Sequence, residues 1–182
     1  TALMNAAENG AVEVLKLLTA ADKDHLDAVS NTGFTSLMIA SAHGRSDAVH
    51  YLVSAGASLE ATADSAVTAL MFAAASNHVD TLKVLIKAGA NLEARHSNGG
   101  TALLEAATGG SVDAMKALVD AGAEVDLVDD DGVTPLMAIA SNGSTEGQKL
   151  ILDHLKKKMS AAELTTYINQ FSKSGGSTVM FA

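Results

Sequence analysis

Apolar and polar positions follow a pattern that returns about every 33 residues along the chain. Within one period, the Ala-rich segment 68–75 favours a helix that packs closely against its neighbours. The segment 79–87 places its apolar side chains on one stripe of a second helix, at Val79, Leu82, Leu85 and Ile86. The segment 91–100 is polar, ends in two glycines and predicts a hairpin-like connection. Each period is therefore predicted to be a helix, a turn, a second helix and an extended finger.

The tetrad Thr-x-Leu-Met, or a close variant, opens each period. It begins at Thr1, Thr35, Thr68, Thr101 and Thr134, and a decayed copy begins at Ser177. The Thr hydroxyl can cap the first helix, and a Gly or Asn nine residues later can end it because these residues tolerate φ > 0. Such agreement indicates a tandem array. The predicted repeats are 1–34, 35–67, 68–100, 101–133 and 134–176, with a partial repeat at 177–182.

Two helices this short cannot bury their apolar faces alone, so neighbouring repeats are expected to stack into one domain spanning 1–182. Only 3% of the residues are aromatic and none is Trp. The core must therefore be filled by Ala, Leu, Val, Ile and Met, which favours closely approaching helices. We expect an all-α solenoid in which the stability of each repeat depends on its neighbours.

The repeat unit resembles the ankyrin repeat, which has a β-turn and two helices in about 33 residues. The resemblance rests on Thr134-Pro135-Leu136, on the turn Asp129–Thr134 and on a Gly-Ala pair after the second helix at Gly56, Gly89 and Gly122. It implies an ankyrin-type helix-turn-helix solenoid with β-hairpin-like fingers, five full repeats and the start of a sixth.

Three departures from the family pattern change this picture. The family's His at the end of the tetrad is Met or Leu here, which predicts packing in place of a polar link. The Asn that is common in the finger is replaced by an acid, at Asp27, Glu60, Glu93 and Asp126. The asparagine hydroxylation known for the family is therefore not expected. The first repeat lacks the Gly-Ala pair, which predicts an irregular finger.

The fifth repeat has Leu155 where the other repeats have the glycine of the Gly-Ala pair. Without that glycine, the second helix should continue to Lys158. Ser160 and Glu163 then match a capping box that opens a further helix. Its predicted buried stripe consists of Ala161, Leu164, Ile168 and Phe171. We therefore expect a helical insertion at about 155–173.

Charge and cysteine content exclude several functions. The formal net charge is −9, which argues against binding to nucleic acid or to an anionic membrane surface. No apolar run is long enough to span a membrane, so no membrane insertion is expected. The chain has no Cys, which excludes disulfides, Cys-ligated zinc and thiol catalysis. We expect an intracellular, cytoplasmic monomer.

Catalytic, cofactor and metal sites are not predicted. The nucleophile elbow, the phosphate loop, the His-Glu-x-x-His motif and the dinucleotide fingerprint are all absent. The acidic run 129–131 fails as a calcium loop, because Leu127 and Ala138 fall where carboxylates are required. The six histidines occupy different places in the repeat, at His25, His43, His50, His78, His96 and His154. The run 156–158 suits a helix C-terminus, with docking of an acidic partner as the alternative.

The class of function that these exclusions leave is recognition of a protein partner. The resemblance implies binding through the fingertips and the exposed ends of the first helices on one concave surface. The matching residues are Asn31, Thr32, Phe34, His43, Asp64, Ser65, Val67, Ser76, Ser97, Asn98, Thr108, Asp130, Asp131, Val133, Ser141 and Asn142. Phe34, Val67 and Val133 share one phase and form a possible hydrophobic rail. The alternative for these three is packing against neighbouring fingers.

The sequence thus predicts a non-catalytic scaffold or adaptor for protein–protein interaction. Both ends of the chain fall inside a repeat, so we expect a fragment of a longer protein or missing disordered ends. The alternative function is a regulatory or targeting ankyrin segment of a larger multidomain enzyme or channel. The partner's identity does not follow from the residues.

Overall fold

The computed structural model describes residues 1–169, and in that range the chain forms eleven α-helices and no strand. The first helix of each repeat is α1 (Ala2–Asn9), α3 (Ser36–Ala42), α5 (Ala69–Ala75), α7 (Ala102–Thr108) or α9 (Pro135–Asn142). The second is α2 (Val12–Ala21), α4 (Ser46–Ala55), α6 (Val79–Lys87), α8 (Val112–Asp120) or α10 (Thr145–Lys158). The last helix is α11 (Ala161–Ile168), and a short 3₁₀ turn, η1, covers Asp64–Ala66.

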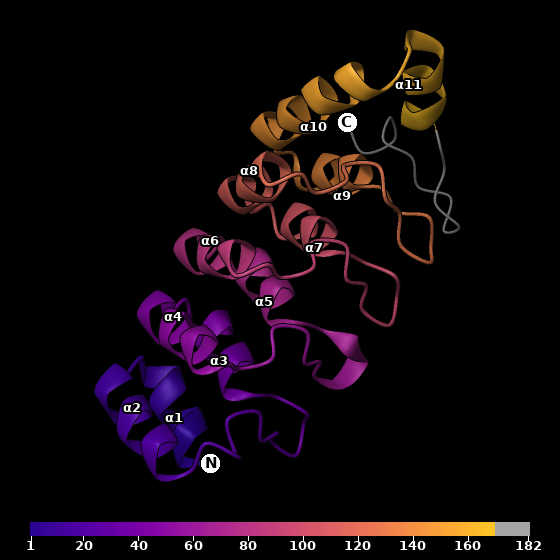
Figure 1. Cartoon of the computed structure of the whole chain (residues 1–182). Helices are drawn as coiled ribbons and strands as arrows, with labels where there is room; N and C mark the ends of the chain where they lie inside the picture. Colours follow the sequence, from indigo (N-terminus) through magenta and orange to yellow (C-terminus); the bar gives the residue numbers. More distant parts are fainter. Residues whose placement is uncertain (170–182) are drawn as a thin grey trace.

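The helices stack in two layers (Figure 1). The second helices form one layer, the first helices form the other, and the fingers project beyond the first helices. Each first helix packs against the first helix of the next repeat and against its own second helix. This arrangement is the predicted helical solenoid.

The predicted caps are present in all five repeats. The backbone N–H three residues after each tetrad Thr donates to that Thr's Oγ1, at 3.1 to 3.4 Å. The turn between the helices has a positive φ at Gly10, Gly44, Asn77, Gly110 and Gly143. The second helices α4, α6 and α8 are followed by glycines in the left-handed region, with φ of 91° to 100°. Local sequence therefore sets where these helices begin and end.

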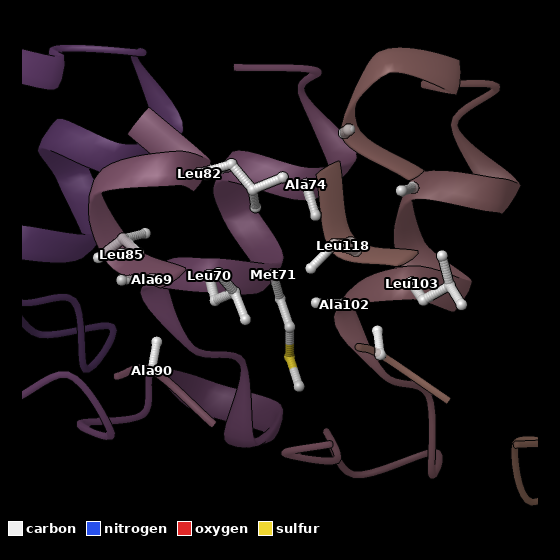
Figure 2. Packing of buried hydrophobic residues seen from close by; sticks show 14 of the residues in the cluster. Ala69, Leu70, Met71, Ala74, Leu82, Leu85, Ala90, Ala102, Leu103 and Leu118 are labelled. Carbon is white, nitrogen blue, oxygen red and sulfur yellow. The ribbon is translucent and has the colours of Figure 1, made fainter. Parts of the chain in front are cut away.

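Aliphatic side chains fill the space between the layers, as the composition predicts. Leu70 and Met71 of α5 belong to one buried cluster with Leu82 and Leu85 of α6 and Leu118 of the next repeat (Figure 2). The Met that replaces the family's His is buried, with Met71 only 1% exposed. The expected packing is present, but a weak polar link persists in the first two repeats, where the sulfur atoms of Met4 and Met38 accept hydrogen bonds from the nitrogens of Thr1 and Thr35, at 3.4 and 3.5 Å.

The two irregular regions also follow the sequence. Helix α2 ends at Asp22 in an extended conformation, because this repeat lacks the Gly-Ala pair. Helix α10 continues for 14 residues to Lys158, with Leu155 fully buried. Glu163 accepts hydrogen bonds from the backbone and hydroxyl of Ser160, at 2.8 and 2.7 Å, which forms the predicted capping box.

The buried face of α11 differs from the prediction. Ala161 is exposed, and Leu164 and Ile168 are only partly buried. The buried residue is Tyr167, whose hydroxyl donates to the carbonyl of Val125 at 3.3 Å. Tyr167 was not part of the predicted stripe, and its hydroxyl can be buried because the fold brings a carbonyl acceptor within reach. Phe171, the end of the predicted insertion and the partial repeat 177–182 lie outside the described residues.

Candidate partner-binding surface

A backbone hydrogen bond between residues four apart closes each finger. The N–H groups of Ser30, Ala63, His96 and Asp129 donate to the carbonyls of Phe34, Val67, Gly100 and Val133, at 2.9 to 3.2 Å. In three fingers the side chain of the first residue also accepts an N–H: Ser30 from Thr32, His96 from Asn98 and Asp129 from Asp131. The acidic run 129–131 is thus a hydrogen-bonded turn, and the fingers are hairpin-like without forming strands in the described range.

The second finger is built differently because Ala63 has no side-chain acceptor. Its tip forms the 3₁₀ turn instead, with φ of 66° at Ser65 and 60° at Ala66. The other fingers place Gly33, Gly99 and Gly132 at the position of Ala66, with φ of 74° to 79°. A left-handed conformation at a residue other than Gly costs roughly 1 to 3 kcal/mol. The strain lies at the tip of a finger predicted to bind a partner.

Backbone hydrogen bonds link each fingertip to the next. The carbonyls of Thr32, Ser65 and Asn98 accept the N–H groups of Asp64, Ser97 and Asp130, at 3.5, 2.7 and 2.9 Å. All six of these residues were predicted to bind the partner. Their main chains are fixed by this ladder, while their side chains are exposed to solvent. The ladder therefore holds one fingertip per repeat in a fixed register.

The residues that were predicted to bind the partner, including these six, fall into two groups by exposure. The finger face is defined here as the predicted residues that are exposed: Asn31, Thr32, His43, Asp64, Ser65, Ser76, Ser97, Asn98, Thr108, Asp130, Asp131, Ser141 and Asn142. They lie on the fingers and at the ends of the first helices, on the side away from the second-helix layer (Figure 1). Phe34, Val67 and Val133 are only partly exposed and pack in part against the core.

The hydrophobic rail is not continuous. The Phe34 ring lies 5.1 Å from the ring of Phe72 in α5, measured between centroids, so it packs between two repeats. In the third finger the same phase is Gly100, where an added Cβ would lie 2.4 Å from His96 Nε2. That nitrogen lies 3.0 Å from Glu105 Oε1. The rail is therefore reduced to Val67 and Val133, on fingers that are not adjacent.

Side chains in the turns between helices bind the preceding repeat. Carbonyls at the ends of the first helices, at Glu8, Ala42, Ala75 and Ala107, accept hydrogen bonds from Arg45, His78, Ser111 and Asn142. These carbonyls have no partner within their own helix, which is why a donor from the next repeat stabilises them. The Asn142 bond is 2.7 Å, so this predicted partner-binding residue also holds two repeats together. These links between repeats were not predicted, although the constant spacing of positions 45, 78 and 111 in the sequence could have indicated them.

The acids that replace the family's finger Asn form a second set of links between repeats. Carboxylate oxygens of Asp27, Glu60 and Glu93 accept the backbone N–H groups of Ser58, Asn91 and Glu124, at 2.8 to 3.0 Å. The fourth acid, Asp126, instead accepts from the Nζ of Lys158 at 2.6 Å. This acid column was visible in the sequence, but its role in joining repeats was not predicted.

Perturbed ionisable groups lie apart from the finger face. A hydrogen bond between Asp22 and His25, at 2.6 Å, lowers the pKa of the aspartate and raises that of the histidine. Burial raises the pKa of the Tyr167 phenol. Within residues 1–169, no three His, Asp or Glu side chains are grouped so that they could hold a metal ion. None of the helices in that range is long and apolar enough to cross a membrane.

The geometry agrees with a comparison of the sequence with known families. A family model described as ankyrin repeats (3 copies) matches residues 1–63 and again residues 61–129. The two matches together span more than two thirds of the 182 residues. Helices α10 and α11, which depart most from the regular repeat, lie beyond the matched range. No curated protein matches this sequence.

Proposed function

This chain belongs to the ankyrin-repeat family, and on that premise we propose that it is a non-catalytic scaffold or adaptor that binds a partner protein through the finger face. Ankyrin repeats are generally protein–protein interaction modules. The observation that carries the proposal is the backbone ladder between fingertips. It fixes the main chain at Asp64, Ser97 and Asp130 in register, so little backbone conformational entropy is lost when a partner binds there.

The shape of the surface supports an elongated target. Ser76, Thr108 and Gly109 end their first helices with small side chains, and all three are exposed. We infer that these small residues leave room beside the fingers for a helix or strand of a partner, and that an enclosed metabolite would fit this surface less well. A typical interface would bury about 800 Å² on this chain, spread over several repeats. We also propose that the protein acts as a monomer in the cytoplasm.

The binding face is tested by comparing variants in a pull-down read by mass spectrometry. Ser76→Arg with Thr108→Arg adds bulk to two exposed positions of the finger face that make no side-chain hydrogen bond. The chain with these two substitutions should no longer capture partner proteins that the unchanged chain captures. A second variant, Val67→Ser with Val133→Ser, tests the remaining rail residues, and Phe34 is left in place because it packs on Phe72.

The matched control is Lys116→Glu with Lys149→Glu, two exposed residues on the second-helix layer. It should capture the same proteins as the unchanged chain, with equal helicity by circular dichroism in all samples. If the finger-face variant still captures every protein while the control loses them, the proposed face is wrong. Steady catalytic turnover that a finger-face substitution abolishes would contradict the non-catalytic assignment.

A further inference from the structure

A row of basic residues lies on the second helices, which form the layer farther from the fingers in Figure 1. Every second helix carries one at the same place in the repeat, and all are exposed: Lys16, His50, Lys83, Lys116 and Lys149. The chain as a whole has 21 acidic residues against 12 Lys and Arg. The same helices also carry a row of exposed acids three residues earlier, at Glu13, Asp47, Asp80, Asp113 and Glu146. Where positive charge is unbalanced on this face is therefore decided by the grooves beside the basic row.

Two adjoining grooves accompany the N-terminal part of this row. The first, of about 320 Å³, lies between α2 and α4 and is lined by Lys16, Lys23, Tyr51 and Ser54 among others. The second, of about 360 Å³, lies between α4 and α6 and is lined by His50, Val53, Ser54, Lys83, Val84, Lys87 and Ala88. No carboxylate from the described part of the chain lines either groove. Each thus combines an apolar floor with a basic rim.

The lysines of the second groove are not neutralised by ion pairs. Among residues 1–169, neither Lys83 nor Lys87 has a carboxylate within 4.0 Å, although Asp80 lies one turn before Lys83 on the same helix. In the first groove, Lys16 is paired with Glu13 at 2.7 Å. The second groove therefore carries the stronger unbalanced positive charge.

The basic character ends after α6. The position of Lys87 is occupied by Asp120 in α8 and by Asp153 in α10. Lys116 and Lys149 continue the row there, but each has an acid one turn before and one turn after it on its own helix, whereas Lys83 has only Asp80 before it. The groove between α4 and α6 is thus the centre of the basic surface.

We propose that the groove between α4 and α6 docks an acidic amphipathic segment of a partner protein. Apolar side chains of the segment would lie on Val53, Val84 and Ala88, and its carboxylates would face Lys83 and Lys87. Charge complementarity selects this occupant, because the net charge of the chain is −9 whereas this groove presents Lys83 and Lys87 beside apolar side chains. The site is separate from the finger face and does not depend on the function proposed for that face.

The test is fluorescence anisotropy of a labelled helical peptide of Glu and Leu titrated with the intact chain. Lys83→Glu with Lys87→Glu should weaken binding about tenfold or more. The matched control, Lys116→Glu with Lys149→Glu, reverses the same number of charges on the same layer and should change the affinity less than about threefold. The finger-face variant Ser76→Arg with Thr108→Arg should bind the peptide without loss.

Other results would overturn the proposal. Equal weakening by the two charge reversals would show that net charge, and not this groove, controls binding. Equal affinity for a peptide with Gln in place of Glu would remove the role of Lys83 and Lys87. Tighter binding of a single-stranded oligonucleotide than of the peptide would assign the surface to nucleic acid. The absence of saturable peptide binding, with helicity intact by circular dichroism, would also contradict it.

Discussion

The regular junctions between repeats and the junction at α10 use the same acid column in two ways. At the regular junctions, Asp27, Glu60 and Glu93 each accept a backbone N–H of the next repeat. At the last junction, Asp126 accepts from the side chain of Lys158, and Glu124 also lies within 3.7 Å of that ammonium. The acid at this place in the repeat thus accepts from a backbone N–H at three junctions and from a flexible lysine side chain at the fourth.

The cause of this difference is a single missing glycine. After α4, α6 and α8 the chain leaves the helix through a left-handed Gly, and the N–H two residues later is free to meet the acid. In the fifth repeat Leu155 continues the helix, so the equivalent residue, Lys157, lies inside α10, where backbone N–H groups bond within the helix. Regular junctions are therefore held by main chain, and the last one by a long side chain that loses entropy on binding.

The largest expected loss of stability comes from a substitution in the interior of the stack, where a repeat has neighbours on both sides. Leu70→Ala, in α5, removes a side chain that is 2% exposed and should destabilise the protein by about 2–5 kcal/mol. Because repeats stabilise each other, loosening should spread into the repeats on both sides. Hydrogen exchange measured by mass spectrometry checks this. A local change below about 1 kcal/mol would contradict the coupling between repeats.

At the C-terminal end, Tyr167→Ala should release α11 from the stack with a cost of about 3 kcal/mol, and the loss should stay local. Limited proteolysis near residues 159–168 should accelerate while the protection of α5 is unchanged. Tyr167→Phe is the matched control, because it removes only the hydroxyl, which donates to the carbonyl of Val125 at 3.3 Å and also meets Thr134, and it should cost about 1 kcal/mol. Equal loosening of α5 and α11 would show that this end is as strongly coupled as the interior.

The acid column itself is compared with Glu60→Gln and Asp126→Asn. Glu60→Gln keeps an oxygen acceptor for the N–H of Asn91, so a loss of about 0.5 kcal/mol is expected, with little dependence on salt. Asp126→Asn breaks an ion pair with Lys158 and should cost about 1 kcal/mol at low salt, less as salt screens the pair. Urea unfolding at two salt concentrations measures both. If the stability loss of Glu60→Gln depended on salt more strongly than that of Asp126→Asn, our distinction between a main-chain junction and an ion-pair junction would be wrong.

The smallest effect is the pH response of the capping box on α11. Hydrogen bonds from Ser160 lower the pKa of Glu163, so the folded state favours the ionised carboxylate. Its contribution should be present above the ordinary pKa of Glu and should be lost as the pH falls through the lowered value. Protection of α11 in hydrogen exchange should therefore fall in acid. Glu163→Gln should remove this part of the response, and an unchanged profile in that variant would contradict it.

Local rules were enough to predict the helices from the sequence. Thr caps, positive-φ turn residues and apolar stripes act over three to nine residues, so the bounds of α6 and the continuation of α10 to Lys158 could both be predicted. The same rules identified the capping box of α11. The partner-binding residues depended on the family resemblance, and their role is still a prediction.

What only the tertiary structure decided involves residues 31 to 42 positions apart. The acid column, the turn side chains that bind the preceding repeat and the contact of Tyr167 with Val125 all join separate repeats. The sequence shows that these residues recur, but their partners depend on how far one repeat is shifted and rotated relative to the next. That geometry results from the packing of small and large aliphatic side chains across the whole stack. The sequence by itself therefore determined the repeating unit and its helices, and stacking decided which polar groups meet.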